Sequence, residues 1–272
     1  MKILVIGRGH LGTFLNDRLK PAIHYKGVLD HLEQNQIDQV DVVVNTVGKT
    51  SLPYCEDNPH STWDSNVVQP LKLLRKMRGQ LLVHISSGCV WDGPYDESGH
   101  AFEPTSPVKP ACFYSWTKAA CDAMMMQEAL SKLLVILRPR QVYSPLKSTR
   151  NTLTKLQVYP KLIDTPNSMT SAETIAKTIE AVASERLIAL NGRIMNVFDL
   201  GVTSPYRVGM LLHEAGLREK PEMMTKSNLD LELKPKRVDT VLNDETFMYR
   251  VSPPKVEDEL RRVIGEYAKT VS

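Results

Sequence analysis

The stretch MKILVIGRGHLGTFLNDRLK, residues 1–20, joins an apolar run, three closely spaced glycines and an amphipathic segment. The run MKILVIG is too short for a helix and rich in branched apolar residues, so it predicts a buried strand. The segment 11–20 has apolar residues at helical spacing and predicts a helix. The stretch therefore predicts a strand, a glycine turn and a helix in succession.

The glycines form the pattern G-x-G-x-x-G directly after the predicted strand. Glycines let such a turn form and bring backbone N–H groups at the helix N-terminus close to a pyrophosphate. A glycine turn without a ligand is the alternative, but the strand before it and the helix after it favour dinucleotide binding. The residues predicted to contact the cofactor here are Gly7, Arg8, Gly9, His10, Leu11 and Gly12.

Further apolar runs recur along the chain and alternate with helical patterns. Continuous Val, Ile and Leu, rather than alternating apolar and polar residues, is typical of parallel strands buried on both faces. We therefore predict an α/β fold with a doubly wound parallel sheet covered by helices. The predicted strands lie in 40–48, 80–91, 133–143 and 193–201, and two of the helices lie in 66–77 and 174–187.

The regular alternation ends at Ser144. Prolines and polar residues cluster in 144–155 and 159–170, and the segment 202–253 is charged and irregular. We expect these stretches to form a small lobe over the carboxyl edge of the sheet, where open α/β sheets bind ligands. The predicted organisation is a nucleotide-binding domain of 1–143 that also receives 171–201, a substrate-binding lobe of 144–170 and 202–253, and a C-terminal helix of 254–272.

Composition narrows the class of protein. The 272 residues are 42% hydrophobic and 24% charged, as in globular proteins, and a formal charge of +3 does not indicate nucleic acid as the main partner. No apolar run approaches the roughly 20 residues of a membrane helix. With no C-x-x-C pair and no signal peptide, we expect free thiols, no metal site and a cytoplasmic protein. The four cysteines are Cys55, Cys89, Cys112 and Cys121.

The choice between NADP(H) and NAD(H) depends on the residues after the second strand, AIHYK at 22–26. An NAD site normally offers an acidic residue there for the ribose 2′-OH, whereas an NADP site offers cations to the extra phosphate. No acid occurs before Asp30, while Arg8, His24 and Lys26 are cationic or ionisable. This pattern favours NADPH over NADH, with solvated surface charges as the alternative.

The stretch FYSWTK, residues 113–118, places Tyr114 and Lys118 one turn apart on a predicted helix, near the hydroxyls that end the strand in 80–91. An ammonium beside a phenol favours the phenolate and lowers its pKa, so this tyrosine could exchange a proton near neutral pH. A buried aromatic residue beside an exposed lysine is the alternative for an isolated Y-x-x-x-K.

The pair is not isolated, because the glycine loop, NTVG at 45–48, Ser87 and then FYSWTK occur in the order found in the extended short-chain dehydrogenase/reductase family. The chain resembles that family over essentially its whole length, which implies a Rossmann-type domain with a small C-terminal substrate-binding lobe, and commonly a homodimer. Its first loop is one residue shorter than the family's usual G-x-x-G-x-x-G. The resemblance implies a catalytic triad of Ser87, Tyr114 and Lys118, with Lys118 also binding the nicotinamide ribose. It further implies cofactor contacts from Asn45, Thr46, Val47, Gly48 and Asn66.

Two further features resemble the nucleotide-rhamnose synthase/epimerase-reductases within this family. They are the S-x-C motif at 87–89 and the segment TRNTLTKLQVYPKLIDTPNSMT at 149–170. The resemblance implies that Cys89 and Lys155 form an acid/base pair for epimerisation, with the direction of proton transfer left open. A 4-keto group acidifies the hydrogens at C3 and C5, because the carbanion is delocalised onto the carbonyl oxygen. A core cysteine and a solvent-facing lysine are the alternatives.

The predicted substrate-binding residues follow the strand at 40–48 or lie within 149–170. Polar residues in such irregular segments often serve only turn formation. They are Lys49, Thr50, Arg150, Asn151, Asn167, Ser168 and Met169.

These features together predict an NADPH-dependent 3,5-epimerase/4-reductase that converts a nucleotide-diphosphate 4-keto-6-deoxyhexose into a rhamnose-type nucleotide sugar. The alternatives are a dTDP-4-dehydrorhamnose reductase without epimerase activity and a non-catalytic NADP-binding regulatory subunit. The sequence leaves the nucleotide (UDP, dTDP or GDP) and the exact sugar stereochemistry open.

Overall fold

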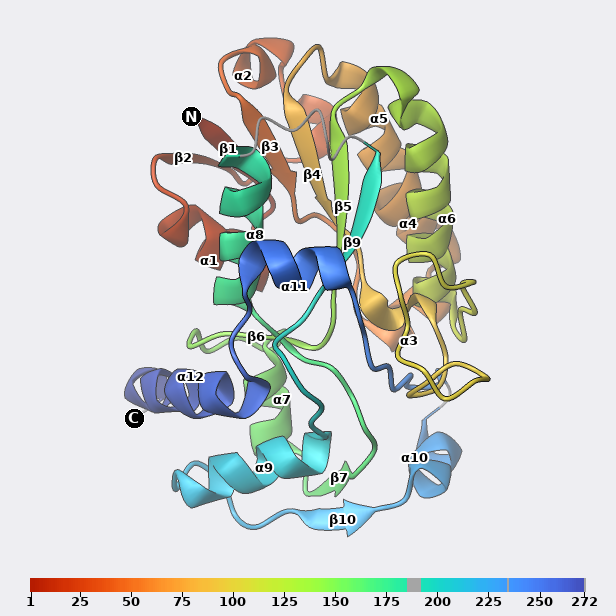
Figure 1. Ribbon diagram of the computed structural model, residues 1–272, viewed down its shortest axis with the longest axis vertical. Helices are drawn as coiled ribbons and strands as arrows, with labels where there is room; N and C mark the ends of the chain where they lie inside the picture. Colours follow the sequence, from red (N-terminus) through yellow and green to blue (C-terminus); the bar gives the residue numbers. More distant parts are fainter. Residues whose placement is uncertain (185–191, 234, 272) are drawn as a thin grey trace.

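Six parallel strands form the central sheet of the protein. The computed structural model describes residues 1–184, 192–233 and 235–271 (Figure 1). The strands run in the order β2-β1-β3-β4-β5-β9, and every neighbouring pair is parallel. Their bounds are β1 Ile3–Ile6, β2 Ala22–Tyr25, β3 Val42–Asn45, β4 Leu81–Ile85, β5 Leu134–Pro139 and β9 Arg193–Val197. The predicted α/β class with a Rossmann-like parallel sheet is confirmed.

Burial on both faces explains the continuous apolar runs. Successive side chains of β1 point to opposite faces, so Ile3 and Val5 join one apolar cluster while Leu4 and Ile6 join another. All residues of β1, β3, β4 and β5 are buried, whereas the edge strand β2 is only partly buried. A strand covered by helices on both sides has no solvent-exposed face, so its sequence does not alternate between apolar and polar residues.

Helices cover the two faces in pairs. On one face α1 (His10–Arg18) packs beside α8 (Ala172–Ser184), and on the other α5 (Gln69–Lys76) packs beside α6 (Phe113–Glu128) (Figure 1). The shorter helices α2 (Gln34–Asp38), α3 (Leu52–Asp57), α4 (Pro59–Trp63) and α11 (Glu245–Val251) complete these layers. The predicted helices at 66–77 and 174–187 correspond to α5 and α8, and residues 185–187 of the second lie outside the described part of the chain. None of the helices in the described ranges is long and apolar enough to cross a lipid bilayer.

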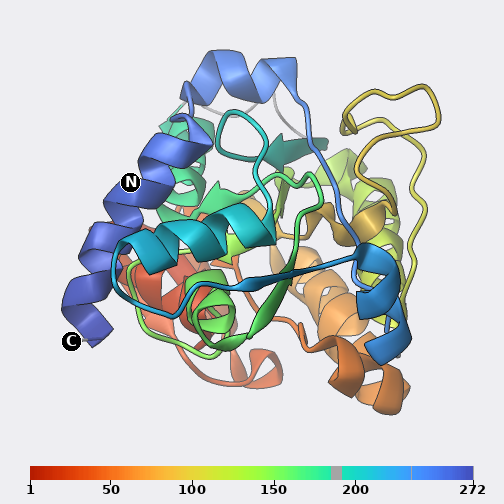
Figure 2. The same ribbon diagram turned by 90° about the horizontal axis from the view of Figure 1, so that it is seen from below.

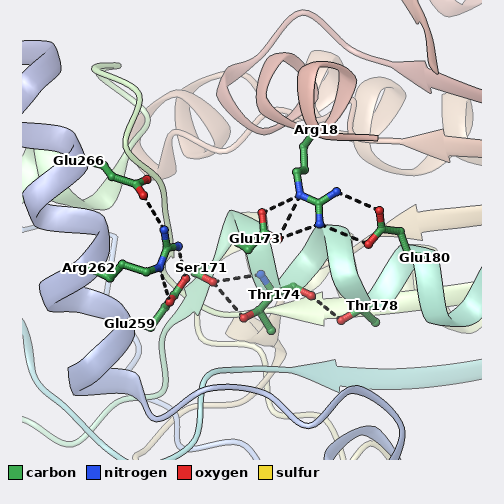
Figure 3. Close-up of polar contacts among 9 residues, drawn as sticks. All are labelled: Arg18, Ser171, Glu173, Thr174, Thr178, Glu180, Glu259, Arg262 and Glu266. Atoms are coloured by element: carbon green, nitrogen blue, oxygen red, sulfur yellow. Dashed lines mark hydrogen bonds and ion pairs between the residues drawn. The ribbon is translucent and has the colours of Figure 1, made fainter. Parts of the chain in front are cut away.

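Ion pairs link α1 to α8, and others lie along α12 (Val256–Val271). The guanidinium of Arg18 lies 2.8 Å from a carboxylate oxygen of Glu173 and 2.9 Å from one of Glu180, both on α8 (Figure 3). On α12, Arg262 pairs in the same way with Glu259 and Glu266.

A cavity of about 410 Å³ is lined partly by Arg18, Glu173, Arg262 and Glu266. Each arginine that lines it, Arg18 and Arg262, is already paired with two glutamates.

A second layer lies beyond the carboxyl ends of the strands, at the bottom of Figure 1. The chain enters it at Gln141, which has a left-handed backbone (φ 42°) and interrupts the predicted strand in 133–143. Its two small sheets pair β6 (Val142–Tyr143) with β8 (Thr170–Ser171) and β7 (Lys161–Ile163) with β10 (Glu222–Met224).

Three helices give this layer a core of its own. In Figure 2 it is seen from below, where α9 (Pro205–Glu214) lies beside α12. Apolar side chains from these two helices and from α7 (Thr152–Val158) form a third buried cluster. The expectation that 202–253 is irregular is wrong, because α9, β10, α10 (Lys226–Glu232) and α11 fall within it. Residue 234, in that segment, and residue 272, at the end of the predicted C-terminal helix, lie outside the described residues.

Candidate active site

The glycine loop sits where the chain leaves β1, and two of its glycines are required by space. Gly7 has a φ of +124°, and a Cβ there would lie 2.4 Å from Oγ1 of Thr46. A Cβ on Gly12 would lie 2.2 Å from the carbonyl oxygen of Gly7. Helix α1 therefore approaches β1 and β3 closely, and its N-terminus opens at Gly9, the N-cap residue. Only glycine, which has no Cβ, fits at these two positions, and the loop therefore exposes its backbone to a ligand.

The topology places the same loop at a switch point of the sheet. From β1 the chain crosses first to β2 on one side and then to β3 on the other. Thr46, at the end of β3, donates from Oγ1 to the carbonyl oxygen of Ile6 at 2.8 Å, which ties the two strand ends together. Open α/β sheets bind ligands in the crevice that such a reversal leaves at the carboxyl ends of the strands.

Asn66 holds one wall of this crevice. It lies in a turn of π-helix, Asp64–Val68, and its side chain is fully buried. Its Oδ1 accepts from the backbone N–H of Lys49 at 2.7 Å, and its Nδ2 donates to the carbonyl oxygen of Lys49 and to Oγ1 of Thr117, each at 3.1 Å. Asn66 thus fixes the Gly48–Lys49 loop against α6, and its amide is occupied by the protein's own groups. Asn45 is likewise buried, and its Oδ1 accepts from the backbone N–H of Val47.

Tyr114 and Lys118 occupy the first turns of α6, on its buried side. Lys118 donates from Nζ to the carbonyl oxygen of Ile85 at 3.0 Å, and its amine faces Gly48. Ser87, two residues beyond β4, is 7% exposed and accepts from the backbone N–H of Cys89 at 3.1 Å. The phenol of Tyr114 is hydrogen-bonded to the Ser87 side chain. The three residues of the predicted triad therefore meet at the carboxyl edge of β4.

The expectation that Lys118 lowers the pKa of Tyr114 is wrong for this structure. Burial raises the pKa of the phenol above its ordinary value, and a negative charge on Cys89 raises it further. The pKa of Lys118 is lowered, chiefly by burial. Desolvation dominates because both groups are almost fully covered and the Lys118 amine is turned toward the Ile85 carbonyl. Tyr114 is therefore a neutral phenol at neutral pH, ready to donate a proton.

Cys89 and Lys155 come from different layers and face the same site. Both are half-buried. The pKa of Lys155 is lowered by burial and by the positive charges of Arg237 and Arg150, whereas a negative charge on Cys89 raises it. Cys89 acts in the same way on Tyr114 and on Lys118. The thiol thus interacts electrostatically with the amine of the lower layer and with the triad of the upper one.

The predicted substrate residues fall into two groups. Asn151, Asn167, Ser168 and Met169 are fully buried, and the three polar ones hydrogen-bond to protein groups. We therefore correct the expectation that these four contact a sugar, since they build the lower layer.

Lys49, Thr50 and Arg150 remain accessible. The Lys49 amine lies 5.0 Å from the centre of the Tyr54 ring, and a guanidinium nitrogen of Arg150 would lie 3.6 Å from a Cβ on Gly9. Both cations thus border the crevice.

A sequence profile described as the NAD dependent epimerase/dehydratase family matches residues 5–177, which is more than half of the chain. The chain belongs to this family. No curated protein matches the chain by sequence.

Solved structures of the same fold include the UDP-rhamnose synthase from Acanthamoeba polyphaga mimivirus, with 20% identity, a TM-score of 0.85, and coverage of 98% of this chain and 99% of that one. The dTDP-4-dehydrorhamnose reductase from Bacillus anthracis in complex with NADP has 16% identity, a TM-score of 0.80, and coverage of 97% and 98%. MoeE5 in complex with UDP-glucose and NAD has 16% identity, a TM-score of 0.80, and full coverage of both chains.

The NAD dependent epimerase/dehydratase family implies a nicotinamide dinucleotide, and the crevice fits one. The glycine cradle and the N-terminus of α1 suit a pyrophosphate. Of the three residues predicted to favour NADP, Arg8 and Lys26 are exposed. His24 instead lies with Nε2 2.7 Å from the carbonyl oxygen of Gly7; since a carbonyl only accepts, Nε2–H donates and the ring supports the loop.

Sequence reasoning missed the contacts that two side chains make at this site. Arg140, at the end of β5, donates from Nη1 to Sγ of Cys89 at 3.0 Å. Its signal was a charged residue inside the apolar run 133–143. His10 was expected to contact the cofactor from the glycine loop, and the structure shows that its ring also contacts Oγ of Ser144 at 3.2 Å. Burial and the charge of Lys155 lower the pKa of His10 to about 4, so its ring is neutral.

Proposed function

We propose that the protein is an NADPH-dependent 3,5-epimerase/4-reductase that forms a rhamnose-type nucleotide sugar from a nucleotide-linked 4-keto-6-deoxyglucose. One observation carries the proposal. The thiol of Cys89 interacts electrostatically both with the phenol of Tyr114 and with the amine of Lys155, so two sets of proton-transfer groups border one crevice. A plain reductase requires only the set around Tyr114.

The triad serves the carbonyl oxygen in both reactions. The neutral phenol of Tyr114 and the hydroxyl of Ser87 donate hydrogen bonds to the C4 oxygen, where negative charge develops as a proton leaves C3 or C5. Cys89 and Lys155, on elements of different layers, take a proton from one face of the ring and return one to the other. Each carbon inverts in this way while the ketone persists.

The reduced nicotinamide, when bound, supplies hydride to C4. Tyr114, which carries its proton at neutral pH, then gives that proton to the C4 oxygen. Lys118, held by the carbonyl oxygen of Ile85 at 3.0 Å and facing Gly48, is placed to bind the ribose and to support the phenolate that remains. The epimerised ketone is therefore reduced at the site where it forms.

NADPH is favoured over NADH by the charges beyond β2. Asp30, the first acid after this strand, hydrogen-bonds with Lys72 and Gln69 at 3.1 and 3.0 Å. Arg8 and Lys26 are exposed cations in the same region. The NADP complex of the Bacillus anthracis reductase supports this assignment, while MoeE5 binds NAD on the same fold.

The substrate class rests on accessible cations and on the structural likeness. Lys49, Arg150 and Arg237 border the crevice and suit a nucleotide diphosphate. The mimiviral structure of the same fold is a UDP-rhamnose synthase, and the bacterial one acts in the dTDP series. UDP and dTDP ketosugars are therefore the first substrates to test.

Exchange with deuterated water tests the epimerase half. The wild-type protein, incubated with the 4-keto-6-deoxyglucose nucleotide in D₂O without NADPH, should place deuterium at both C3 and C5. Cys89→Ala and Lys155→Ala should lose inversion, whereas Cys112→Ala, a matched change at another half-buried thiol, should retain it. Wild-type protein that leaves both positions unlabelled has no epimerase activity.

The same variants separate the alternatives. A dTDP-4-dehydrorhamnose reductase without epimerase activity would reduce the epimerised ketone and be indifferent to Cys89→Ala and Lys155→Ala. A regulatory subunit would bind NADPH without turning over any ketone, and Tyr114→Phe would alter only its association with a partner.

A further inference from the structure

His84 is a fully buried histidine in β4, a strand whose other residues are all apolar. Burying an imidazole is costly unless its ring nitrogens have hydrogen-bond partners. In the register of the sheet, His84 lies directly opposite Asn45, the last residue of β3. Both strands end there, at the edge of the sheet that carries the candidate active site. The triad and the Cys89–Lys155 pair use neither of these two side chains.

The ring of His84 has a polar neighbour at each nitrogen. Nδ1 lies 3.1 Å from Nδ2 of Asn45, and Nε2 lies 3.8 Å from Sγ of Cys121 on α6. On the far side of Asn45, Oδ1 accepts from the backbone N–H of Val47 at 3.1 Å. A continuous line of polar contacts therefore runs from α6 through β4 and β3 to the loop 46–49.

The bond to Val47 fixes the direction of every other contact in this line. A backbone N–H must donate, so the oxygen of the Asn45 amide faces Val47 and its NH₂ group faces His84. The NH₂ group donates, so Nδ1 of His84 accepts and the ring proton is on Nε2. The Nε2–H group then donates to the sulfur of Cys121, which is a thiol because burial raises its pKa. An imidazolium could not accept from Asn45, so the arrangement requires a neutral ring.

The surroundings of the ring also favour its neutral form. Burial lowers the pKa of His84 well below its ordinary value, and the positive charge of Lys118 lowers it further. Lys118 and Cys121 lie three residues apart on the buried side of α6, and the Lys118 amine donates to the carbonyl oxygen of Ile85. A neutral ring at this position does not repel that amine.

Holding the strands together does not require the polar pair. Backbone pairing already joins β3 to β4 from Val42 to Asn45. Val43 and Leu82, the next residues on the same face, are apolar and buried. The Asn45–His84 pair differs because its far end is a backbone N–H of the loop 46–49. We therefore look for its role in that loop.

The loop 46–49 is anchored at three points. Thr46 donates to the carbonyl oxygen of Ile6, Asn66 binds the backbone of Lys49, and Asn45 accepts from Val47. The third anchor depends on the orientation of an amide. If the Asn45 amide turned over, its NH₂ group would face the N–H of Val47 and the bond would be lost. His84 opposes this, because its Nδ1 accepts from the NH₂ group.

The anchored loop faces the amine that is predicted to bind the nicotinamide ribose. A Cβ on Gly48 would lie 3.9 Å from Nζ of Lys118. We propose that His84 is a positioning residue for the dinucleotide: its Nδ1 keeps the Asn45 amide in the orientation that anchors Val47, and so sets the loop 46–49 against Lys118. This inference rests on the proposed cofactor and is independent of the epimerase activity. His84 itself takes no part in proton transfer.

Two substitutions of similar size separate the acceptor from the volume of the ring. His84→Asn keeps an acceptor oxygen at the place along the side chain where Nδ1 stands, whereas His84→Leu puts a methyl group there. In fluorescence titrations, the NADPH dissociation constant should stay within about threefold of the wild type for His84→Asn and rise about tenfold or more for His84→Leu, the effect of one lost hydrogen bond. His213→Leu, at a half-buried histidine of α9 whose ring contacts a backbone carbonyl, is the control and should change it by less than about twofold.

A double-variant cycle tests whether His84 acts through Asn45, and it does not need His84→Asn to fold. Asn45→Ala should weaken NADPH binding about as much as His84→Leu does. The double variant should be no weaker than either single variant, because all three lose the same anchor. Effects that add, or equal losses in His84→Asn and His84→Leu, would refute the positioning role.

NMR of protein labelled with ¹⁵N-histidine tests the arrangement without any cofactor. His84, identified by the signals that His84→Leu lacks, should have a bare Nδ1 and a proton on Nε2 throughout the range from about pH 5 to 8. A ring that gains a proton in this range, or that carries its proton on Nδ1, would refute the role of His84 even if NADPH binds normally. The expected ring in a wild-type protein that binds neither NADPH nor NADH would instead refute the proposed function, and the role toward the cofactor with it.

Discussion

Replacing Gly12 by alanine should damage both the fold and the cofactor cradle. The added Cβ would lie 2.2 Å from the carbonyl oxygen of Gly7 and 2.7 Å from Oγ1 of Thr46. The nearest atom is backbone, so no side-chain rotation relieves the clash, and α1 must move away from β1. Overpacking of this kind costs about 1–3 kcal/mol, and we place Gly12→Ala at the upper end of that range.

The matched control is Gly265→Ala, which also lies within a helix, α12, and whose Cβ would meet nothing within 4 Å. That change should stabilise the protein by about 0.5–1 kcal/mol, because alanine is the better helix former. Urea unfolding gives both free energies, and NADPH fluorescence titration gives the affinity. We expect the Gly12→Ala dissociation constant to rise about tenfold or more, equivalent to about 1.4 kcal/mol. Equal midpoints and equal affinities for the wild type and Gly12→Ala would refute the close approach of α1 to β1.

Three more outcomes follow from the buried polar groups. Asn66→Ala removes the acceptor of the Lys49 backbone N–H and leaves the Lys49 carbonyl oxygen with only the Cys55 thiol as a donor. Unfolding experiments should therefore show a loss of about 1–3 kcal/mol, and KM should rise. Tyr114→Phe should lower kcat for ketone reduction by about 100-fold or more, with NADPH affinity within about twofold of the wild type by titration, because the phenol serves proton transfer. Burial raises the pKa of Asp199 to about 6 from its usual 3.8. The stabilisation contributed by this one carboxyl group, about 3 kcal/mol, is therefore complete below pH 4 and is lost as the pH rises through 6; Asp199→Asn should remove this contribution to the pH dependence of the urea midpoints.

Each of these outcomes has a result that contradicts it. Unchanged stability and KM in Asn66→Ala would mean that the Lys49 backbone finds other partners. Full reductase activity in Tyr114→Phe would move the proton donor elsewhere. The native state keeps the proton of Asp199 to a higher pH than the unfolded chain does. The unfolding free energy of the wild type must therefore fall relative to that of Asp199→Asn as the pH rises from 4 to 6. A constant difference would contradict the raised pKa.

The nucleotide-binding half could be predicted because its physics is local in the sequence. Strands such as 3–6 and 42–45 are buried on both faces, which requires continuous apolar residues. The glycine pattern reflects steric demands at Gly7 and Gly12 that no other residue meets. Both signals lie within about a dozen residues, so they can be read without knowing the rest of the fold.

The lower layer could not be predicted in the same way. Two of its strands, β6 and β8, have two residues each, and its order comes from contacts between distant segments. Asn167, for example, binds Arg140 and Asp239, which lie 27 and 72 residues away. Asn151 and Asn167 were expected to contact substrate because they lie in the segment 149–170, and nothing in the sequence marks them as buried.

The charge state of Tyr114 also required the structure. The spacing to Lys118 correctly places both residues on one side of α6. It does not say that the Lys118 amine turns to the carbonyl of Ile85 or that the phenol is buried. Desolvation therefore outweighs the neighbouring cation.

The central claim is that one crevice holds both a reductase triad and an epimerase pair. The most direct measurement is NMR of the 4-keto-6-deoxyglucose nucleotide in D₂O with wild-type, Cys89→Ala and Tyr114→Phe protein, first without and then with NADPH. In a separate sample, each protein receives the epimerised ketone together with NADPH. We predict label at C3 and C5 with the wild type, none with Cys89→Ala, and reduction of the epimerised ketone by Cys89→Ala but not by Tyr114→Phe. Labelling that survives in Cys89→Ala, or that is absent from the wild type while reduction proceeds, would contradict the claim.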